Sequence, residues 1–303
     1  EPDPRLDTLD KIASSEKVLP DVIEFRAIAG LVKGASKGEG LGNKFLSHIH
    51  EVDMILMVLR SFRNDDIVHV ENRVNPVEDE EILMMELTLH DEMRLEILII
   101  KLEKEARKDA KLKIQICEKI LTQLSNIQPA SDYVMDDSWD ESLRIWRKHL
   151  NLITDKPILK VANISTDSEN ITFNADFEID ILNESQMQDM SPEDRKELGM
   201  DETGALDKLI NACYDRLDLA TYLTAGPKEA RAWTLTKGMM APSCAGKIHT
   251  DFVKGFIKAE VVPYSNFVES NGWKGAYEKG SVKTVGKDYL MQDGDVVEFK
   301  VRS

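Results

Sequence analysis

A glycine-rich segment constrains this chain more than any other part of its sequence. It follows the strand-like stretch Val22–Phe25 and ends shortly before Phe45. Its five glycines lie within thirteen residues: Gly30, Gly34, Gly38, Gly40 and Gly42. Glycine at this density costs backbone entropy and supplies no side-chain packing, so it usually marks a loop whose backbone approaches a ligand closely. The pattern predicts a strand, a ligand-contacting loop and then a helix from about Gly42 through His50.

Composition excludes several classes of protein. No apolar stretch approaches the ~20 residues that a membrane span needs, and the N-terminus has no apolar signal core, so we expect a cytoplasmic protein without membrane contact. The formal net charge of −16 opposes binding to DNA, and any RNA contact must come from a local basic patch. The three cysteines lack CxxC spacing, which indicates free thiols in a reducing compartment.

Residues 77–125 have the periodicity of long amphipathic helices. Apolar residues recur at three- and four-residue spacing in two series: Leu95, Leu98 and Leu102, then Leu112, Ile116, Ile120 and Leu124. The polar stretch Arg107–Asp109 separates the series, so we predict an antiparallel helical hairpin. Such a stripe packs within the molecule more often than against a partner. A third helix is expected over Ser138–Leu150, with Trp139 and Trp146 against the hairpin base.

The remaining sequence predicts parallel strands and then a β-rich unit. The apolar runs Met54–Leu59 and Pro157–Asn163 are short enough to be buried strands of a parallel sheet. A helix is expected over about Leu206–Leu217. From Thr221 to the end, half-buried strands are predicted from alternating polar and apolar residues.

Two segments resemble one family of proteins. The glycine-rich string with LVKGAS and GEGLGN resembles switch II of the YchF (Obg-like ATPase) subfamily of P-loop NTPases, and Ala245–Phe252 resembles its closing TGS module. The resemblance covers most of the chain. It implies an α/β fold: an incomplete P-loop NTPase (Ras-like) domain, an α-helical hairpin insert and a C-terminal β-grasp-like TGS domain. The implied boundaries are 1–76 with 151–218 for the nucleotide-binding domain, 77–150 for the insert and 219–303 for the TGS domain.

The sequence departs from this family at the phosphate site. The P-loop pattern G-x-x-x-x-G-K-[ST] occurs nowhere in the 303 residues, so the chain is expected to lack the N-terminal P-loop and switch I. Ala27 replaces the family's magnesium-associated aspartate, and a methyl group cannot order a magnesium-bound water. We therefore expect Mg²⁺ and ATP to serve the intact protein and to bind this chain weakly.

The resemblance also implies roles for individual residues. Gly30 matches the glycine whose N–H reaches the γ-phosphate, and Leu31 stands where Ras-like proteins orient water with glutamine. His69 matches a loop histidine of the family and is the candidate for orienting that water, because its pKa lies near neutrality. A histidine between two valines also suits a purely structural role.

This sequence matches only some of the family's base-contacting residues. Asn163 and Ile164 match the family's adenine-contacting residues, whereas Thr166 stands where the family has glutamate. Without a carboxylate there, guanine loses a charge-assisted hydrogen-bond partner worth roughly 1.5–3 kcal/mol. The preference for ATP over GTP is left open by Thr166.

By resemblance, the intact protein hydrolyses ATP to ADP and phosphate as a switch that acts on the ribosome, and this chain alone is expected to be inactive. Between Thr221 and Val262, six basic side chains face three acidic ones, and we predict ribosome contact at Lys247 and Lys254. A solvated surface explains these charges equally well. The alternative function is a nucleotide-independent module that binds the ribosome or a protein.

Overall fold

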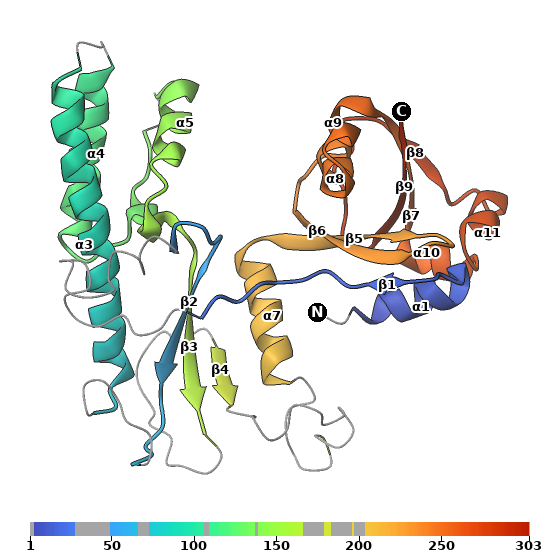
Figure 1. The fold of residues 1–303 in the computed structure, drawn as a ribbon, viewed down its shortest axis with the longest axis horizontal. Coiled ribbons are helices and arrows are strands. Elements are labelled where there is room, and N and C mark those ends of the chain that lie inside the picture. Colours follow the sequence, from blue (N-terminus) through green and yellow to red (C-terminus); the bar gives the residue numbers. More distant parts are fainter. Residues whose placement is uncertain are drawn as a thin grey trace. The chain divides into compact units, whose positions relative to one another are not determined.

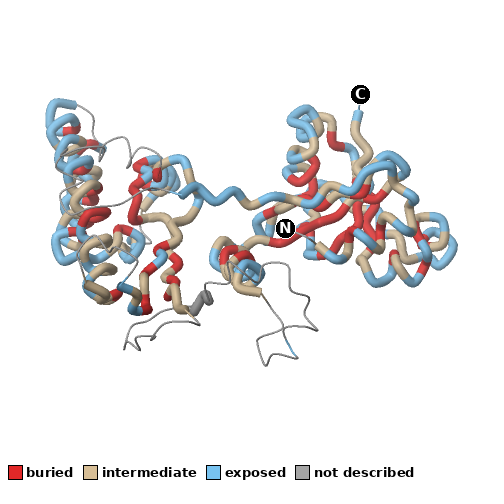
Figure 2. Tube along the Cα trace, turned by 60° about the horizontal axis from the view of Figure 1, so that its bottom comes forward, coloured by how far each residue is buried: buried red, intermediate tan, exposed pale blue. Residues whose placement is uncertain are grey.

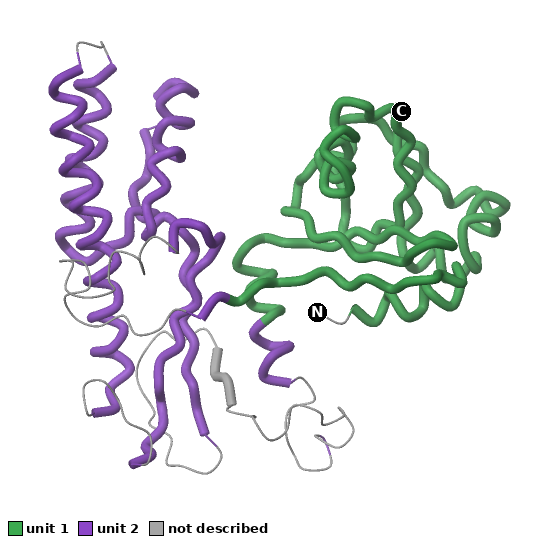
Figure 3. The backbone as a smooth tube through the Cα atoms, viewed as in Figure 1, with its two compact units in different colours: residues 1–25, 210–303 green, residues 26–209 purple. Residues whose placement is uncertain are grey.

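The computed structural model describes residues 3–27, 49–65, 73–105, 109–136, 139–165, 179–182, 196 and 204–302 (Figure 1). The chain divides into two compact units, one of residues 1–25 and 210–303 and the other of residues 26–209 (Figure 3). The α/β fold class predicted from the sequence is confirmed. Residues 1–25 group with the C-terminal unit, whereas the sequence analysis placed them with the nucleotide-binding domain.

The unit of residues 26–209 contains a parallel sheet. Its described strands are β2 (Ile55–Arg60), β3 (Ile158–Ile164) and β4 (Ile179–Leu182), in the order β2-β3-β4. Ile55 pairs with Ile158 and Arg60 with Asn163, so the carboxyl ends of β2 and β3 are level. The two predicted strands are confirmed within one residue at each end. Met57, Leu59 and Leu159 are buried, whereas Val58, on the other face of β2, is 54% exposed, so β2 is buried on one face and not on both.

The predicted helical hairpin is present in the same unit. Helix α3 (Pro76–Glu103) begins at Asn75, whose side chain accepts the Glu78 N–H, and α4 (Ala110–Leu124) packs against it. The core contains Leu95, Leu102, Ile116, Cys117, Ile120 and Leu124. Leu112 differs from the prediction, because its side chain is 36% exposed.

The third helix, α5 (Glu141–His149), is shorter than the predicted Ser138–Leu150. Asp140 caps it by accepting the Leu143 N–H at 2.9 Å, which ends the extended chain before it and fixes the first turn. Trp139 precedes the helix and Trp146 lies on it, and both pack against the hairpin core as predicted.

Buried polar contacts join the helices to the start of β3. Asp91 of α3 is fully buried and accepts the N–H groups of Ile153 and Thr154, in the 3₁₀ turn η3 (Ile153–Asp155), at 2.9 and 2.8 Å. Its carboxylate also accepts the Thr154 hydroxyl at 2.7 Å. From α5, Arg147 donates to Asp155 at 2.6 Å. These bonds fix the segment from which β3 starts.

The unit of residues 1–25 and 210–303 contains a mixed sheet. Among the described residues its strands run in the order β1-β6-β5-β9-β7-β8. They are β1 (Val18–Leu19), β5 (Leu219–Ala225), β6 (Ala230–Thr236), β7 (Phe256–Pro263), β8 (Lys283–Val285) and β9 (Asp295–Val301). The helix α7 (Ala205–Arg216) precedes β5 close to its predicted place.

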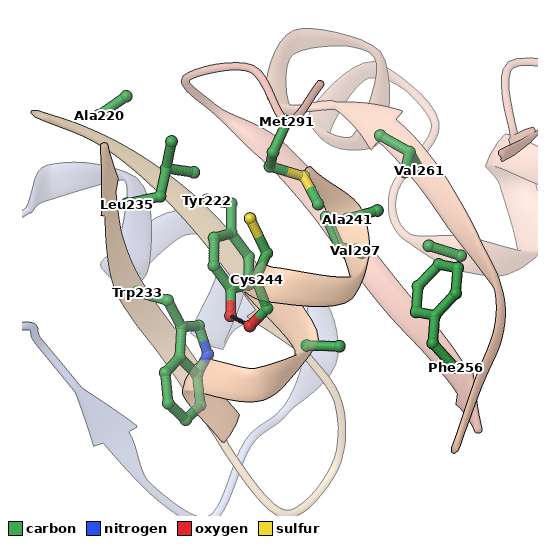
Figure 4. Close-up of a cluster of buried hydrophobic side chains, with 12 residues drawn as sticks. Ala220, Tyr222, Trp233, Leu235, Ala241, Cys244, Phe256, Val261, Met291 and Val297 are labelled. Carbon is green, nitrogen blue, oxygen red and sulfur yellow. Dashed lines mark hydrogen bonds between the residues drawn. The ribbon is translucent and has the colours of Figure 1, made fainter. Parts of the chain in front are cut away.

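Helices pack against this sheet and form two hydrophobic cores with it. The helices are α1 (Pro4–Ala13), α8 (Ala241–Ile248), α9 (Asp251–Gly255), α10 (Tyr264–Glu269) and α11 (Trp273–Glu278). One core packs α8 against the strands, and there the Tyr222 hydroxyl donates to the Cys244 carbonyl at 2.9 Å (Figure 4). The other core contains Leu6 and Leu9 of α1 with Phe267 of α10. Figure 2 shows where the buried residues lie along the Cα trace.

The strand predicted at Val22–Phe25 is wrong. Residues 20–27 have no regular secondary structure, and the exposed fractions of Val22 and Phe25 are 77% and 43%. β1 pairs with β6 only through Val18 and Leu19, because Pro20 has no N–H to continue the ladder. The Asp21 carboxylate then accepts the Thr234 N–H of β6 in place of a main-chain partner. Apart from its last two residues, the helix predicted from Gly42 lies outside the described residues.

Candidate functional site

The carboxyl end of β3 is the candidate nucleotide-base site. Asn163 and Ile164 are the last two residues of β3, and both are half-buried. Asn163 lies between Arg60 on β2 and Ile181 on β4. Ligands of open parallel sheets bind outside the carboxyl ends of the strands, so both residues lie at the edge where their predicted role requires them.

Arg60 fastens the loop that leaves β2 beside this corner. Its guanidinium donates to the carbonyls of Phe62 and Asn64 at 3.0 and 2.7 Å and lies 4.9 Å from the centroid of the Phe62 ring. The Ser61 N–H donates to the Asn163 carbonyl at 2.8 Å. The sequence analysis did not identify Arg60, although an arginine directly after a buried apolar run was a usable signal.

Only part of the predicted nucleotide site can be located. Gly30, Leu31 and His69 lie outside the described residues, and so does Thr166. Their proximity to Asn163 and Ile164 therefore stays a prediction.

One described residue, Ala27, belongs to the predicted magnesium site. Mg²⁺ needs oxygen ligands in near-octahedral geometry. Ala27 is exposed and offers only a methyl group. In the described parts of the chain, no group of three or more His, Cys, Asp or Glu side chains could hold a metal ion.

Lys247 and Lys254 lie at one corner of the C-terminal unit. Lys247 is in the last turn of α8 and Lys254 in the last turn of α9, and both side chains are exposed. A Cβ on Gly246 would lie 2.5 Å from Cγ2 of Val253, so the glycine is what allows these helices to touch. Each lysine directly follows a residue of this contact in the sequence, so the two exposed lysines lie on helices that touch.

The other basic residues of this region are arranged differently. Lys228 and Lys237 flank opposite ends of β6, and Lys237 forms an ion pair with Asp218 at 3.3 Å. Lys258 pairs with Glu260 at 3.2 Å. The basic residues between Thr221 and Val262 therefore do not form one continuous surface, and the corner of Lys247 and Lys254 is the part that remains as a candidate contact.

The same unit has a groove of about 660 Å³ whose lining includes four acidic side chains and two basic ones, Arg5 and Lys237. Arg5 binds both Asp3 and Asp293, at 2.7 and 3.0 Å, and the Asp293 carboxylate also accepts the Thr221 N–H. These contacts hold the pKa of Arg5 above its usual value, chiefly through the hydrogen bond to Asp3. The groove thus joins α1 to the strands of its own unit.

Comparison with known proteins gives concordant results. Residues 219–302 match the family model YchF-GTPase_C, which is described as a protein of unknown function. The chain is 42% identical over 322 residues to the ribosome-binding ATPase YchF of Bacillus subtilis, covering 99% of this chain and 87% of that protein. It is 39% identical to Obg-like ATPase 1 of Gallus gallus, covering 99% of this chain and 81% of that protein.

The fold has a solved counterpart as well. The structure of the Schizosaccharomyces pombe YchF GTPase superimposes with a TM-score of 0.80 at 32% identity. The match covers 99% of this chain and 85% of that one.

Proposed function

Because this chain belongs to the YchF and Obg-like ATPase family, we propose that it acts as an ATP-dependent switch that associates with ribosomes and converts ATP to ADP and phosphate. The observation that carries this proposal is the position of Asn163 and Ile164 at the carboxyl edge of the parallel sheet. Two relatives are named ribosome-binding ATPase or Obg-like ATPase, which supports the same activity and partner.

In this proposal the chain's own residues recognise the base. The side-chain amide of Asn163 can accept from the adenine amino group and donate to N7, and Ile164 packs on the ring. Gly30 would donate its N–H to the γ-phosphate. Leu31 has no side-chain donor or acceptor that could hold the attacking water, so His69 would orient that water. Residues 26–76 with 151–218 would form the nucleotide-binding domain, 77–150 the insert and 219–303 the TGS domain, and residues 1–25 group with the C-terminal unit.

We also propose a cytoplasmic location, as ribosome association requires. Among the described residues no helix is long and apolar enough to cross a membrane.

Calorimetric titration with ATP tests the nucleotide part of the proposal. The chain as given has no P-loop pattern, so we expect it to show no micromolar binding. Adding the P-loop segment of the Bacillus subtilis relative to its N-terminus should restore binding, and Asn163→Ala in that extended form should weaken it about tenfold. Micromolar binding by the chain as given, or an Asn163→Ala form that binds normally, would contradict this assignment.

A second function, a nucleotide-independent module that binds ribosomes or a protein, is favoured by Ala27, which replaces the family's magnesium-associated aspartate with a methyl group. Sedimentation of the chain with ribosomes, with and without ATP, separates the two functions. Binding that does not depend on ATP, even in the extended form that binds ATP, would favour the second.

A further inference from the structure

Arg60 lies directly beside Asn163 at the carboxyl edge of the parallel sheet. It is the last residue of β2 and pairs in register with Asn163 on β3. Paired residues of neighbouring strands present their side chains on the same face of a sheet, so the guanidinium stem and the side-chain amide are neighbours. Both residues are half-buried. Arg60 therefore stands next to the group that is proposed to read the base.

The contacts of Arg60 hold its guanidinium against the loop that leaves β2. Nε donates to the Phe62 carbonyl at 3.0 Å, and a terminal nitrogen donates to the Asn64 carbonyl at 2.7 Å. The same group lies 4.9 Å from the centroid of the Phe62 ring, which is 4% exposed. Only a planar guanidinium can donate to two carbonyls and stack on a ring at the same time. Residues 61–64 are thus fixed by one side chain.

The fixed loop in turn holds the main chain of Asn163. The buried Ser61 donates its N–H to the Asn163 carbonyl at 2.8 Å and its hydroxyl to the Leu59 carbonyl at 3.3 Å. The main-chain pairing of β2 with β3 therefore continues one residue beyond Arg60. Because the carbonyl and the side chain of Asn163 share one Cα, holding the carbonyl also limits where the side-chain amide can lie.

We propose that Arg60 is a positioning residue of the base site. By fixing residues 61–64 it keeps Ser61 bound to the Asn163 carbonyl, and so keeps the Asn163 amide in place for adenine. This role rests on the proposed function, in which Asn163 recognises the base. A side chain that is already ordered loses less conformational freedom on binding, and the affinity for the base is correspondingly higher. Arg60 acts through Ser61 and does not itself contact the nucleotide.

Hydrogen exchange of the Ser61 amide, followed by NMR in the chain as given, tests the positioning step without any ligand. Arg60→Ala should speed this exchange about tenfold or more, because the loop would open locally more often. Arg144→Ala is the matched control. Arg144 of α5 also donates to two carbonyls, those of Trp139 and Asp136, both at 3.3 Å, and its loss should leave the Ser61 exchange unchanged.

Saturation transfer from the chain to adenosine, at about millimolar concentration, measures base recognition without the phosphates. The unmodified chain and Arg144→Ala should give a signal, whereas Arg60→Ala and Asn163→Ala should lose it. Arg60→Lys keeps the charge but not the planar fork, so it should show an intermediate loss and a faster Ser61 exchange. A melting curve shows whether each variant is folded, and Arg60→Lys provides both measurements if Arg60→Ala does not fold.

An unchanged Ser61 exchange in the Arg60 variants would overturn the proposal. So would an adenosine signal that survives Arg60→Ala but is lost in Asn163→Ala, because Arg60 would then stabilise the loop without serving the base. If the unmodified chain gave no adenosine signal, the base site of the proposed function would be wrong and this role of Arg60 with it. Faster Ser61 exchange in Arg60→Ala would in that case show that Arg60 acts on the fold alone.

Discussion

Asp91 accepts hydrogen bonds from residues that lie 62 and 63 positions later in the chain. Its carboxylate is fully buried, and three donors satisfy it. No local pattern predicts such a partner, because an acid within a helix normally indicates a solvated face. Arg60 escaped prediction for a similar reason, since its partners are carbonyls that only the folded loop presents. Asn163 and Ile164 could be located from sequence, because a strand and its end are local features.

Asp91→Ala should lower the free energy of unfolding by about 3 kcal/mol or more, because it leaves three buried donors without a partner. Asp91→Asn should lower it less, since one acceptor oxygen is retained. Urea unfolding followed by circular dichroism measures both, with the exposed Glu81→Ala as the control. Equal midpoints for Asp91→Ala and Glu81→Ala would show that the contacts to Ile153 and Thr154 do not stabilise the fold.

The two helices of the hairpin were predicted correctly because apolar residues recur about every 3.6 residues along the buried face of a helix. The strand predicted at Val22–Phe25 does not form, because of contacts that exist only in the folded chain. Pro20 and Asp21 end the main-chain pairing with β6 that this strand would have continued. The helix periodicity also did not distinguish Leu112, which is 36% exposed, from the buried Ile120.

Ile120→Ala and Leu112→Ala therefore form a matched pair on α4. Ile120 is fully buried, so its truncation should cost about 2–5 kcal/mol of unfolding free energy. Leu112→Ala should change it by only about 0.5 kcal/mol. Thermal or urea unfolding of each variant checks the expectation. Similar losses in both variants would mean that the exposed edge of α4 contributes to the core as much as its centre.

The contact of His50 with α3 gives the unit of residues 26–209 a pH dependence. The ring of His50 lies 5.3 Å from that of His90, and Arg94 donates to it. Burial lowers the pKa of His50, as do the charges of Arg94 and His90; Asp91 and the Asn151 carbonyl oppose this. Because the folded pKa is below the ordinary value near 6.5, the neutral ring favours folding above that pH, and this contribution is lost as the pH falls through the folded pKa.

Urea unfolding at pH 7.5 and at 5.5 should therefore show a loss of stability on acidification that is smaller in His50→Gln. The comparison between variants isolates His50 from the carboxylates that titrate in the same range. An unchanged pH dependence in His50→Gln would place the titrating group elsewhere.

At the scale of the whole molecule, charge is distributed unevenly. The chain carries a net charge of −16, yet its α8–α9 corner presents Lys247 and Lys254. Sequence could count these lysines but could not show that their helices touch, because the contact of Gly246 with Val253 exists only in the folded chain. Lys237 and Lys258 lie elsewhere in the unit, in ion pairs with Asp218 and Glu260.

Lys247→Glu with Lys254→Glu should weaken sedimentation with ribosomes, and rising salt should weaken the unmodified protein in the same way, because contacts to phosphate release counterions. Lys274→Glu with Lys287→Glu changes the charge equally at two other exposed lysines of the same unit and should sediment as the unmodified protein does. Both variants should melt normally, since the altered side chains are exposed. Equal sedimentation of both variants and the unmodified protein across a salt series would assign Lys247 and Lys254 to solubility. A loss in both variants would instead indicate a response to net charge, because the corner could then not be distinguished from the rest of the surface.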